Sequence, residues 1–587
     1  MQWCLFTKQW LFNNQQQNKM PQIDVRQPIK RFWLLLKPDK NEIRNVYFYA
    51  VFNGLVYLTL PIGIQAIINL IQGGQVSTSW IVLVVFVLMG IGLNGLLTIS
   101  QMRIVENLQQ KIFTRAAFEF AYRIPRIKME ALYKHYAPEL MNRFFDIISV
   151  QKGLAKILID FITAGIQVIF GLILLSFYHP FFIIFSFVLV ALIFAIFKIT
   201  ARKGLETSLS ESKSKYKVAH WLEEMARNNV TLKLAGKTNL HLERTNEEVG
   251  DYIQHRQKHF KVLIQQFVLM VGFKVIVATG LLAIGGVLVM EQQMNIGQFV
   301  ASEIIILLVL GAVEKLILSL ETIYDVLTSL EKIGQVTDLE LESTEGVEIS
   351  EHCGEDGLSV DISHLNFTYP GNAIPTLNDI NLNIKKGERI LINGNNNTGK
   401  STLLHLIAGV YQPIEGYIAY NGYPQGNLEP QNLRSIIGDC LMEEQLFEGT
   451  ILDNIGMRRK NATMENIKWA VDNLGLTEFI KSQPKGYDTI IEPDGQHYSK
   501  GTIDRLILAR SIADKPRLLL IKDAFQSIKT QDKTGIIDFL TDKDQPWTLI
   551  AASSDMYLAK KMDQIVRLEE GKIIKVGNYQ EMKNNII

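Results

Sequence analysis

The sequence predicts an α-helical membrane domain with six spans, followed by an α/β domain that binds nucleotide phosphates. Of the 587 residues 48% are hydrophobic, and the long apolar runs all lie within residues 46–320. The later part instead alternates short apolar strands with helical patterns, which is typical of an α/β layout. Within it, Gly394–Thr402 reads GNNNTGKST and fits the phosphate-binding pattern G-x-x-x-x-G-K-[ST].

Composition excludes several other classes of protein. The net charge of +1 gives no support for a nucleic-acid partner. The cysteines have neither disulfide nor metal-site spacing; they are Cys4, Cys353 and Cys440. Charged and amide side chains interrupt the first apolar residues, so no signal peptide is expected. Met20 offers a second candidate start, which would leave residues 1–19 outside the protein.

Six segments are long and apolar enough to cross a membrane, which takes about 20 residues each. They are residues 46–71, 80–101, 156–178, 180–198, 262–289 and 299–320. The three short connections between them lack Lys and Arg, whereas residues 102–155 and 199–261 are rich in both. The positive-inside rule therefore predicts both termini and both long loops in the cytoplasm, with the protein in the cell (inner) membrane.

The two long loops carry helical patterns at Glu106–Arg123 and His220–Leu234, so we expect helices that extend the spans. Their tips, with Ala137–Asp146 and Trp221–Asn229 as candidates, are expected to contact the soluble domain. The domains predicted are an N-terminal cytoplasmic segment, a membrane domain, an acidic linker and a nucleotide-binding domain. Their ranges are 1–40, 41–330, 331–357 and 358–587.

Three charged residues fall inside the predicted spans: Lys274, Glu303 and Glu314. Charges within a membrane often mark a substrate path. They also occur near helix ends, where the side chain reaches the polar interface. Both interpretations stay open from the sequence.

The phosphate-binding pattern stands in the context that it needs. The apolar strand Glu388–Asn393 precedes it, and the apolar helical segment Leu403–Ala408 follows it. Glycines let the loop aim its N–H groups at phosphate oxygens, and the helix N-terminus adds a positive dipole end. Lys400 would reach the β- and γ-phosphates, and the Ser401 hydroxyl would bind Mg²⁺.

The chain from about residue 41 resembles a half-transporter of the ATP-binding cassette (ABC) exporter family, with six spans and one cassette. The segment Leu60–Asn69 is similar to the first span of type I secretion and peptide exporters. The resemblance implies a type I exporter fold, ATP and Mg²⁺ as cofactors, the lipid bilayer, a transported substrate and a second half-transporter as partners. We expect no N-terminal peptidase domain of the kind that some of these exporters carry.

The resemblance also implies the nucleotide-binding residues. Tyr369, in the segment Phe367–Pro370, would stack on adenine, and the signature segment Tyr498–Thr502 would contact the γ-phosphate across a dimer. The implied contacts are Tyr369, Gly394, Asn395, Asn396, Asn397, Thr398, Gly399, Lys400, Ser401, Thr402, Ser499 and Gly501. Ser401 would hold the metal, and Asp523 stands at the position of the catalytic glutamate.

Several other family positions depart from the pattern. The usual metal-positioning aspartate before Asp523 is Lys522, and the usual glutamine position falls on Met442, with Gln445 out of register. Lys529 replaces the aspartate of the D-loop, and Ser554 replaces the switch histidine. Within the signature, Lys500 and Thr502 differ from the family pattern.

These departures predict slow ATP hydrolysis, because a group that orients water contributes roughly 10²- to 10⁴-fold in rate. The Lys522 ammonium could offset triphosphate charge in place of metal support, or it could point away from the site. The favoured interpretation is an ATP-binding subunit paired with a competent partner. An active homodimeric exporter and a membrane nucleotide sensor that does not transport are the alternatives.

Overall fold

The computed structural model describes residues 26–72, 78–133, 135–352, 354, 356–441 and 445–583. The chain forms two compact units. The first comprises residues up to Pro125 together with Ala137–Asp338, and the second comprises Arg126–Tyr136 together with the chain from Leu339. Most of the predicted segment 1–40, part of the loop Gln72–Ser79 and Met442 lie outside the described residues.

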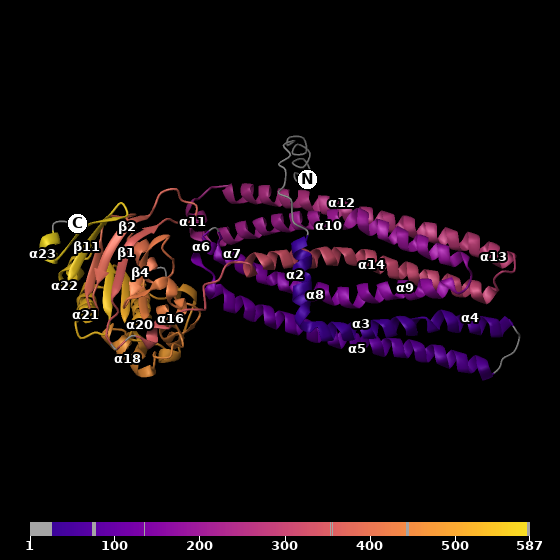
Figure 1. Ribbon diagram of the computed structural model, residues 1–587, viewed down its shortest axis with the longest axis horizontal. Coiled ribbons are helices and arrows are strands. Elements are labelled where there is room, and N and C mark those ends of the chain that lie inside the picture. The colour runs from indigo at the N-terminus through magenta and orange to yellow at the C-terminus, as the bar shows by residue number, and fades with distance from the viewer. Residues whose placement is uncertain are drawn as a thin grey trace. The chain divides into compact units, whose positions relative to one another are not determined.

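The first unit is a bundle of long helices, drawn from indigo through magenta to pink in Figure 1. Its described residues contain 6 helical stretches long and apolar enough to cross a membrane, as the sequence predicted. The helices are α2 (Arg26–Leu36), α3 (Lys40–Tyr57), α4 (Thr59–Gln72), α5 (Thr78–Arg123), α7 (Ala137–Met141), α8 (Asp146–Lys156), α9 (Ile162–Ser176), α10 (Phe181–Arg227), α11 (Asn229–Leu234), α12 (Leu240–Gly280), α13 (Gly286–Met290) and α14 (Ile296–Thr337).

The helices extend well past the length of a bilayer, as the helical patterns of the long loops predicted. Helix α10 has 47 residues, which is roughly 70 Å of helix against about 30 Å of hydrocarbon. Helix α14 continues to Thr337, so the first residues of the predicted linker are helical.

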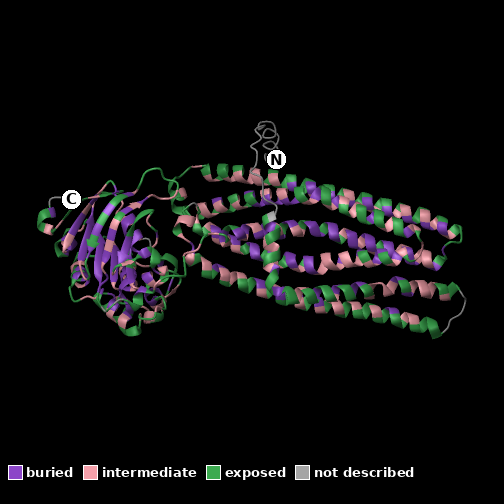
Figure 2. Ribbon diagram, viewed as in Figure 1, coloured by how far each residue is buried: buried purple, intermediate pink, exposed green. Residues whose placement is uncertain are grey.

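Apolar side chains hold the bundle together and also cover its outside. The largest apolar cluster of this unit joins α9, α10, α12 and α14 through residues such as Leu175, Phe182 and Val313. Other large apolar side chains are exposed, including those of Leu88 and Phe187. Exposed residues, coloured green, recur along these helices in Figure 2. Exposed apolar side chains suit contact with lipid.

The second unit contains a 6-stranded sheet in the order β12-β11-β3-β10-β9-β6 and a 4-stranded sheet in the order β2-β1-β4-β5. Strands β11, β3, β10, β9 and β6 run parallel. The strands are β1 (Val360–Phe367), β2 (Leu377–Ile384), β3 (Arg389–Asn393), β4 (Glu415–Tyr420), β5 (Tyr423–Pro424), β6 (Ile437–Cys440), β7 (Gly449–Thr450), β8 (Ile490–Ile491), β9 (Leu518–Lys522), β10 (Thr548–Ala552), β11 (Gln564–Glu569) and β12 (Lys572–Gly577).

This unit also contains helices, and the central strands β3, β10 and β9 of the 6-stranded sheet are almost entirely buried (Figure 2). The helices are α6 (Met129–Leu132), α15 (Lys400–Ile407), α16 (Pro430–Ser435), α17 (Ile451–Gly456), α18 (Met464–Asn473), α19 (Thr477–Ser482), α20 (Lys500–Ile512), α21 (Thr530–Thr541), α22 (Met556–Lys561) and α23 (Tyr579–Met582). The predicted α/β arrangement is confirmed, because parallel strands alternate with helices along the chain.

The register of the central strands positions the site. Ile392 of β3 pairs with Ala552 of β10, and Ala552 pairs with Lys522 of β9. Because parallel strands end at one edge, the segments after β3, β10 and β9 emerge side by side. Lys522 is therefore two strand spacings, about 10 Å, from the strand that carries the phosphate loop.

A segment from between two membrane helices belongs to the second unit. The backbone of Ile127 bridges Leu341, and the Lys128 amide donates to the Glu340 carbonyl at 2.9 Å. This contact segment is Arg126–Tyr136, whereas the predicted Ala137–Asp146 directly follows it and belongs to the first unit. The predicted contacts of Ala137–Asp146 and Trp221–Asn229 with the soluble domain stay predictions. The pairing of the segment Arg126–Tyr136 is made by backbone groups, which apolar spacing does not predict.

Candidate functional site

The phosphate loop joins β3 to the N-terminus of α15. Gly399, at the last position before α15, has φ of +99°, a conformation that side chains with a Cβ rarely adopt. A Cβ there would lie 2.7 Å from Leu377 Cδ2. The loop therefore requires glycine at Gly399, and the strand–loop–helix geometry expected of the motif is present.

The Lys400 side chain folds over this loop. Its Nζ donates to the carbonyl oxygens of Gly394 and Asn395, both at 2.6 Å. Burial lowers the pKa of the ammonium; the charge of Asp523 acts to raise it, and the charge of Lys522 acts to lower it further. Lys522 and Asp523 thus both lie close enough to act on the charge at the phosphate loop.

Hydroxyl groups support the loop from within. The Thr398 hydroxyl donates to the Asn395 carbonyl at 3.0 Å, and Thr398 is buried. Thr402 is also buried, and its hydroxyl shares a 3.0 Å hydrogen bond with the Tyr369 hydroxyl. Ser401 is half-buried in the first turn of α15. The structure therefore links Tyr369 directly to the helix that follows the loop.

Three aromatic rings surround Tyr369. Phe367 and Tyr411 meet it edge-on, with ring centroids 5.0 and 5.5 Å away. Tyr133, from the segment Arg126–Tyr136, instead lies nearly parallel to it, with centroids 5.4 Å apart and planes at 18°. Tyr133 thus covers the face of Tyr369 in the way that a purine ring would. The sequence carried no signal for this contact, since 235 positions separate the two tyrosines.

The segments after β9 and β10 meet beside the loop. Asp523 has φ of +48°, and its amide donates to the Ala552 carbonyl at 3.0 Å. Ser554, where the family has a histidine, is exposed, whereas Asp555 caps α22 and forms an ion pair with Lys533. Lys529 is exposed immediately before α21. These segments bring one ammonium and one carboxylate, Lys522 and Asp523, to the site.

The signature residues stand at the start of α20, a helix separate from α15. Ser499 is the N-cap, with its oxygen accepting from the Thr502 amide at 3.2 Å. A Cβ on Gly501 would lie 2.5 Å from the Ser527 carbonyl oxygen, so glycine is required there. The Lys500 ammonium lies 3.1 Å from the carboxylate of Asp504, which is fully buried.

Sequence reasoning singled out Lys500 but missed the buried carboxylate that it neutralises. A lysine four residues before an aspartate would have been the signal. Of the residues around the glutamine position, the structure describes Gln445, which is exposed and whose carbonyl accepts from Arg510. This contact with Arg510 uses the backbone of Gln445 and not its side-chain amide.

Two of the charged residues in the predicted spans pair with each other. Lys274 Nζ on α12 lies 2.6 Å from Glu314 Oε2 on α14. An ion pair between two helices lowers the cost of placing both charges in a membrane. This ion pair joins α12 to α14.

Family models match both parts of the chain. The model described as ABC transporter transmembrane region matches residues 44–313, and the model described as ABC transporter matches residues 377–526. The chain belongs to the ABC transporter family. Because the match to the transmembrane-region model covers the apolar helices, the chain is a multi-pass membrane protein.

Relatives of this ABC transporter chain include the uncharacterized ABC transporter ATP-binding protein YfiB of Bacillus subtilis. The two are 32% identical over 254 residues, which is 43% of each chain. The leukotoxin translocation ATP-binding protein LktB of Mannheimia glucosida is 28% identical over 303 residues, 51% of this chain and 42% of that one. The matched segments thus span less than half the length of these curated relatives.

The fold of the ABC transporter chain also matches a solved structure. It superposes on a bacterial Atm1-family ABC exporter with ATP bound at a TM-score of 0.79, covering 93% of this chain and 97% of that one. The sequences are 18% identical, so the likeness concerns the fold. It confirms the predicted order of a six-helix membrane domain and a P-loop domain.

Proposed function

We propose that this chain is the ATP-binding half of a membrane exporter, that it hydrolyses ATP slowly, and that it works with a second, competent half-transporter. One observation carries the proposal. A complete phosphate loop stands beside Lys522, at the strand end where the family places a metal-positioning carboxylate. The features that bind phosphate are present, whereas those that activate water are altered.

The nucleotide site follows from the loop. Backbone N–H groups of residues 394–399 and the start of α15 would surround the phosphates, and the Lys400 ammonium would exchange its two carbonyl contacts for phosphate oxygens. Tyr369 would stack on adenine, and Thr402 would hold its hydroxyl in place. Ser499 and Gly501 would face the nucleotide of a partner cassette at the start of α20.

The donor set only partly suits Mg²⁺, which requires oxygen ligands. Ser401 would supply a hydroxyl and Asp523 a carboxylate, while Lys522 supplies none. When bound, Mg²⁺ would neutralise phosphate charge. The Lys522 ammonium, which already lowers the pKa of Lys400, would contribute part of the same positive charge from the protein itself.

Hydrolysis also needs a group that orients the attacking water. Asp523 stands at that position with a side chain one methylene shorter than the glutamate of the family. Its positive φ and the hydrogen bond from its backbone amide to the Ala552 carbonyl restrict where the carboxylate reaches. The exposed Ser554 stands where the family has an imidazole, just after the end of the neighbouring strand β10. We expect turnover reduced by roughly 10²- to 10⁴-fold, since losses at one site do not simply add.

The surroundings of the chain follow from the charge of its loops. Both long loops are rich in Lys and Arg, which supports a cytoplasmic position for them and for the cassette, with the protein in the cell (inner) membrane. A partner with intact catalytic residues would complete one faster site, which would still use this chain's signature segment Tyr498–Thr502. A homodimer would instead carry the altered residues in both sites.

The test is ATP turnover by the purified chain in lipid nanodiscs, measured beside binding of a fluorescent ATP analogue. Binding without turnover above the Lys400→Ala background supports the proposal. Addition of the competent partner, recovered by crosslinking in membranes of the source cell, should then raise turnover. Turnover far above the Lys400→Ala background by the chain alone would instead identify an active homodimeric exporter.

A further inference from the structure

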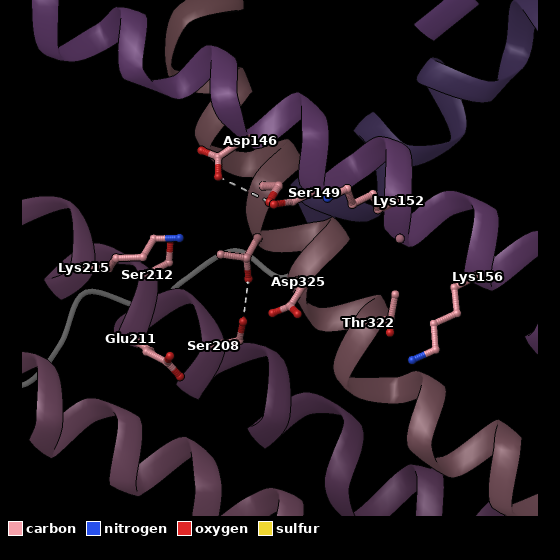
Figure 3. A pocket seen from close by; sticks show the side chains of 13 residues that line it. Asp146, Ser149, Lys152, Lys156, Ser208, Glu211, Ser212, Lys215, Thr322 and Asp325 are labelled. Carbon is pink, nitrogen blue, oxygen red and sulfur yellow. Dashed lines mark hydrogen bonds between the residues drawn. The ribbon is translucent and has the colours of Figure 1, made fainter. Parts of the chain in front are cut away.

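A polar cavity of about 410 Å³ lies between α8, α10 and α14 in the first unit (Figure 3). It lies where these helices extend past the predicted spans. Apart from Gly153, every side chain that lines it is polar or charged. The lining residues are Asp146, Ser149, Lys152, Gly153, Lys156, Ser208, Glu211, Ser212, Lys215, Thr322, Asp325, Thr328 and Ser329.

The cavity is formed by one polar face of each helix. On all three helices the lining residues recur every three or four positions, so they project in a common direction. Apolar contacts flank the space, with Val150 and Ile157 packed on Val326 and Leu330. At Gly153 the helices touch, because a Cβ there would lie 2.3 Å from Val326 Cγ2.

Most carboxylates of the cavity already have partners. Asp146 accepts a hydrogen bond from the Tyr216 hydroxyl, and Ser329 lies 3.5 Å from its other oxygen. Glu211 forms an ion pair with Arg256 at 3.2 Å. Within the described part of the chain, Asp325 is the cavity carboxylate with neither a hydrogen bond nor an ion pair.

The ammonium groups of the cavity lack such partners. Among the described residues, none of Lys152, Lys156 and Lys215 forms an ion pair with a carboxylate; Lys215 lies over the Tyr216 ring instead. Lys152 and Lys156 are one helical turn apart on α8, where like charges repel. Hydrogen bonds from hydroxyl groups leave the charge of Asp146 in place, so among the described residues three ammonium groups without an ion pair face two such carboxylates, Asp146 and Asp325. The cavity therefore carries a small excess of positive charge.

We infer that this cavity binds a small polar organic anion, which makes such anions the substrate class of the proposed exporter; this step rests on the proposed function. Lys152 and Lys156 would each take an acidic group of the ligand, and the lining hydroxyls would bind its polar body. The volume suits a small molecule, because ligand pockets measure about 300–1,000 Å³. An apolar ligand would find no apolar side chain in the lining.

The test uses citrate as the probe, with spermidine as a polar cation of opposite charge. Each is titrated calorimetrically into the full chain in nanodiscs, without nucleotide or Mg²⁺. Citrate should bind, and Lys152→Gln with Lys156→Gln should weaken it by roughly tenfold or more. Asp325→Asn should strengthen it severalfold because a repelling charge is removed, and Lys203→Gln, an exposed lysine on α10 outside the cavity, should change nothing.

Three results would each overturn the inference: citrate binding with the same affinity in the cavity variants, binding of spermidine but not citrate, or no binding of citrate. Binding of the ATP analogue in the same preparation separates this result from the proposed function. If citrate binds with the predicted charge dependence but the chain fails to bind ATP, the anion site in the cavity is supported and the proposal of an ATP-binding exporter is contradicted. The Lys400→Ala variant should leave citrate binding unchanged, which excludes the phosphate loop as the citrate site.

Discussion

The phosphate loop and the strand ends beside it differ in which atoms carry their function, backbone atoms in the loop and side-chain atoms at the strand ends. The loop acts mainly through its backbone, and Gly399 has the positive φ that the motif requires. The neighbouring strand ends act through side chains, and there Lys522 and Ser554 replace the usual groups while the strands keep their register. Under the proposed function, the binding site stays intact while the chemistry next to it changes, because the two depend on different atoms.

Removal of the lysine from the loop should have the largest effect. Lys400→Ala should weaken binding of an ATP analogue about 100-fold, because charge-assisted hydrogen bonds to the phosphates are lost. Fluorescence titration of the chain in nanodiscs measures this. Lys386→Ala, which removes an exposed lysine of the same unit, is the matched control and should bind normally. Equal affinity in both variants would mean that the nucleotide binds elsewhere.

Restoring the carboxylates at the end of β9 should produce the next largest effect, an increase in ATP turnover. Lys522→Asp combined with Asp523→Glu should raise ATP turnover roughly 10- to 100-fold, because a metal-positioning and a water-orienting carboxylate return together. Phosphate release in nanodiscs, with and without the Lys400→Ala change, measures it. No gain would show that the exposed Ser554 position or the glutamine position limits the rate instead.

The start of α20 offers a test on stability. Lys500→Ala leaves the buried Asp504 carboxylate without its ammonium, and should cost about 1–2 kcal/mol after allowing for the exposure of the lysine. Thermal unfolding of the full chain followed by nanoscale fluorimetry measures it. Asp504→Asn added to Lys500→Ala should recover most of the loss. A double variant no more stable than Lys500→Ala would assign the loss to the helix start itself.

The smallest effect is expected at Tyr369, the residue proposed to stack on adenine. Tyr133→Ala should strengthen binding of the ATP analogue about two- to tenfold, because the ring that covers Tyr369 no longer has to leave. Tyr133→Phe keeps the stacked ring and should bind like the natural chain. Weaker binding in Tyr133→Ala would mean that Tyr133 holds the adenine rather than competing with it.

The periodic and local features were readable from the sequence. The six apolar helices, the strands β3, β9 and β10, and the strand–loop–helix around Lys400 all follow from patterns within a few residues. The stack of Tyr133 on Tyr369 joins distant segments and depends on a backbone bridge between Ile127 and Leu341. Patterns on one helix carry no information about such a contact.

The charge pairs show the same limit. Lys274 and Glu314 each looked like an isolated charge in a span, and their ion pair appears only when α12 and α14 lie together. The cavity likewise needs three separate helices to bring Lys152, Lys215 and Asp325 around one space. Spacing along one helix predicts which residues share a face, whereas the partner of that face comes from tertiary packing.

The metal dependence of nucleotide binding tests most directly whether binding survives where catalysis is altered. The affinity of the chain in nanodiscs for a fluorescent ATP analogue would be measured with Mg²⁺ and again with excess EDTA, with turnover followed in the same sample. We predict similar affinity in both conditions and turnover near the Lys400→Ala background, because the Lys522 ammonium supplies positive charge from the protein. A sharp loss of affinity in EDTA, together with rapid Mg²⁺-dependent turnover, would contradict the proposal.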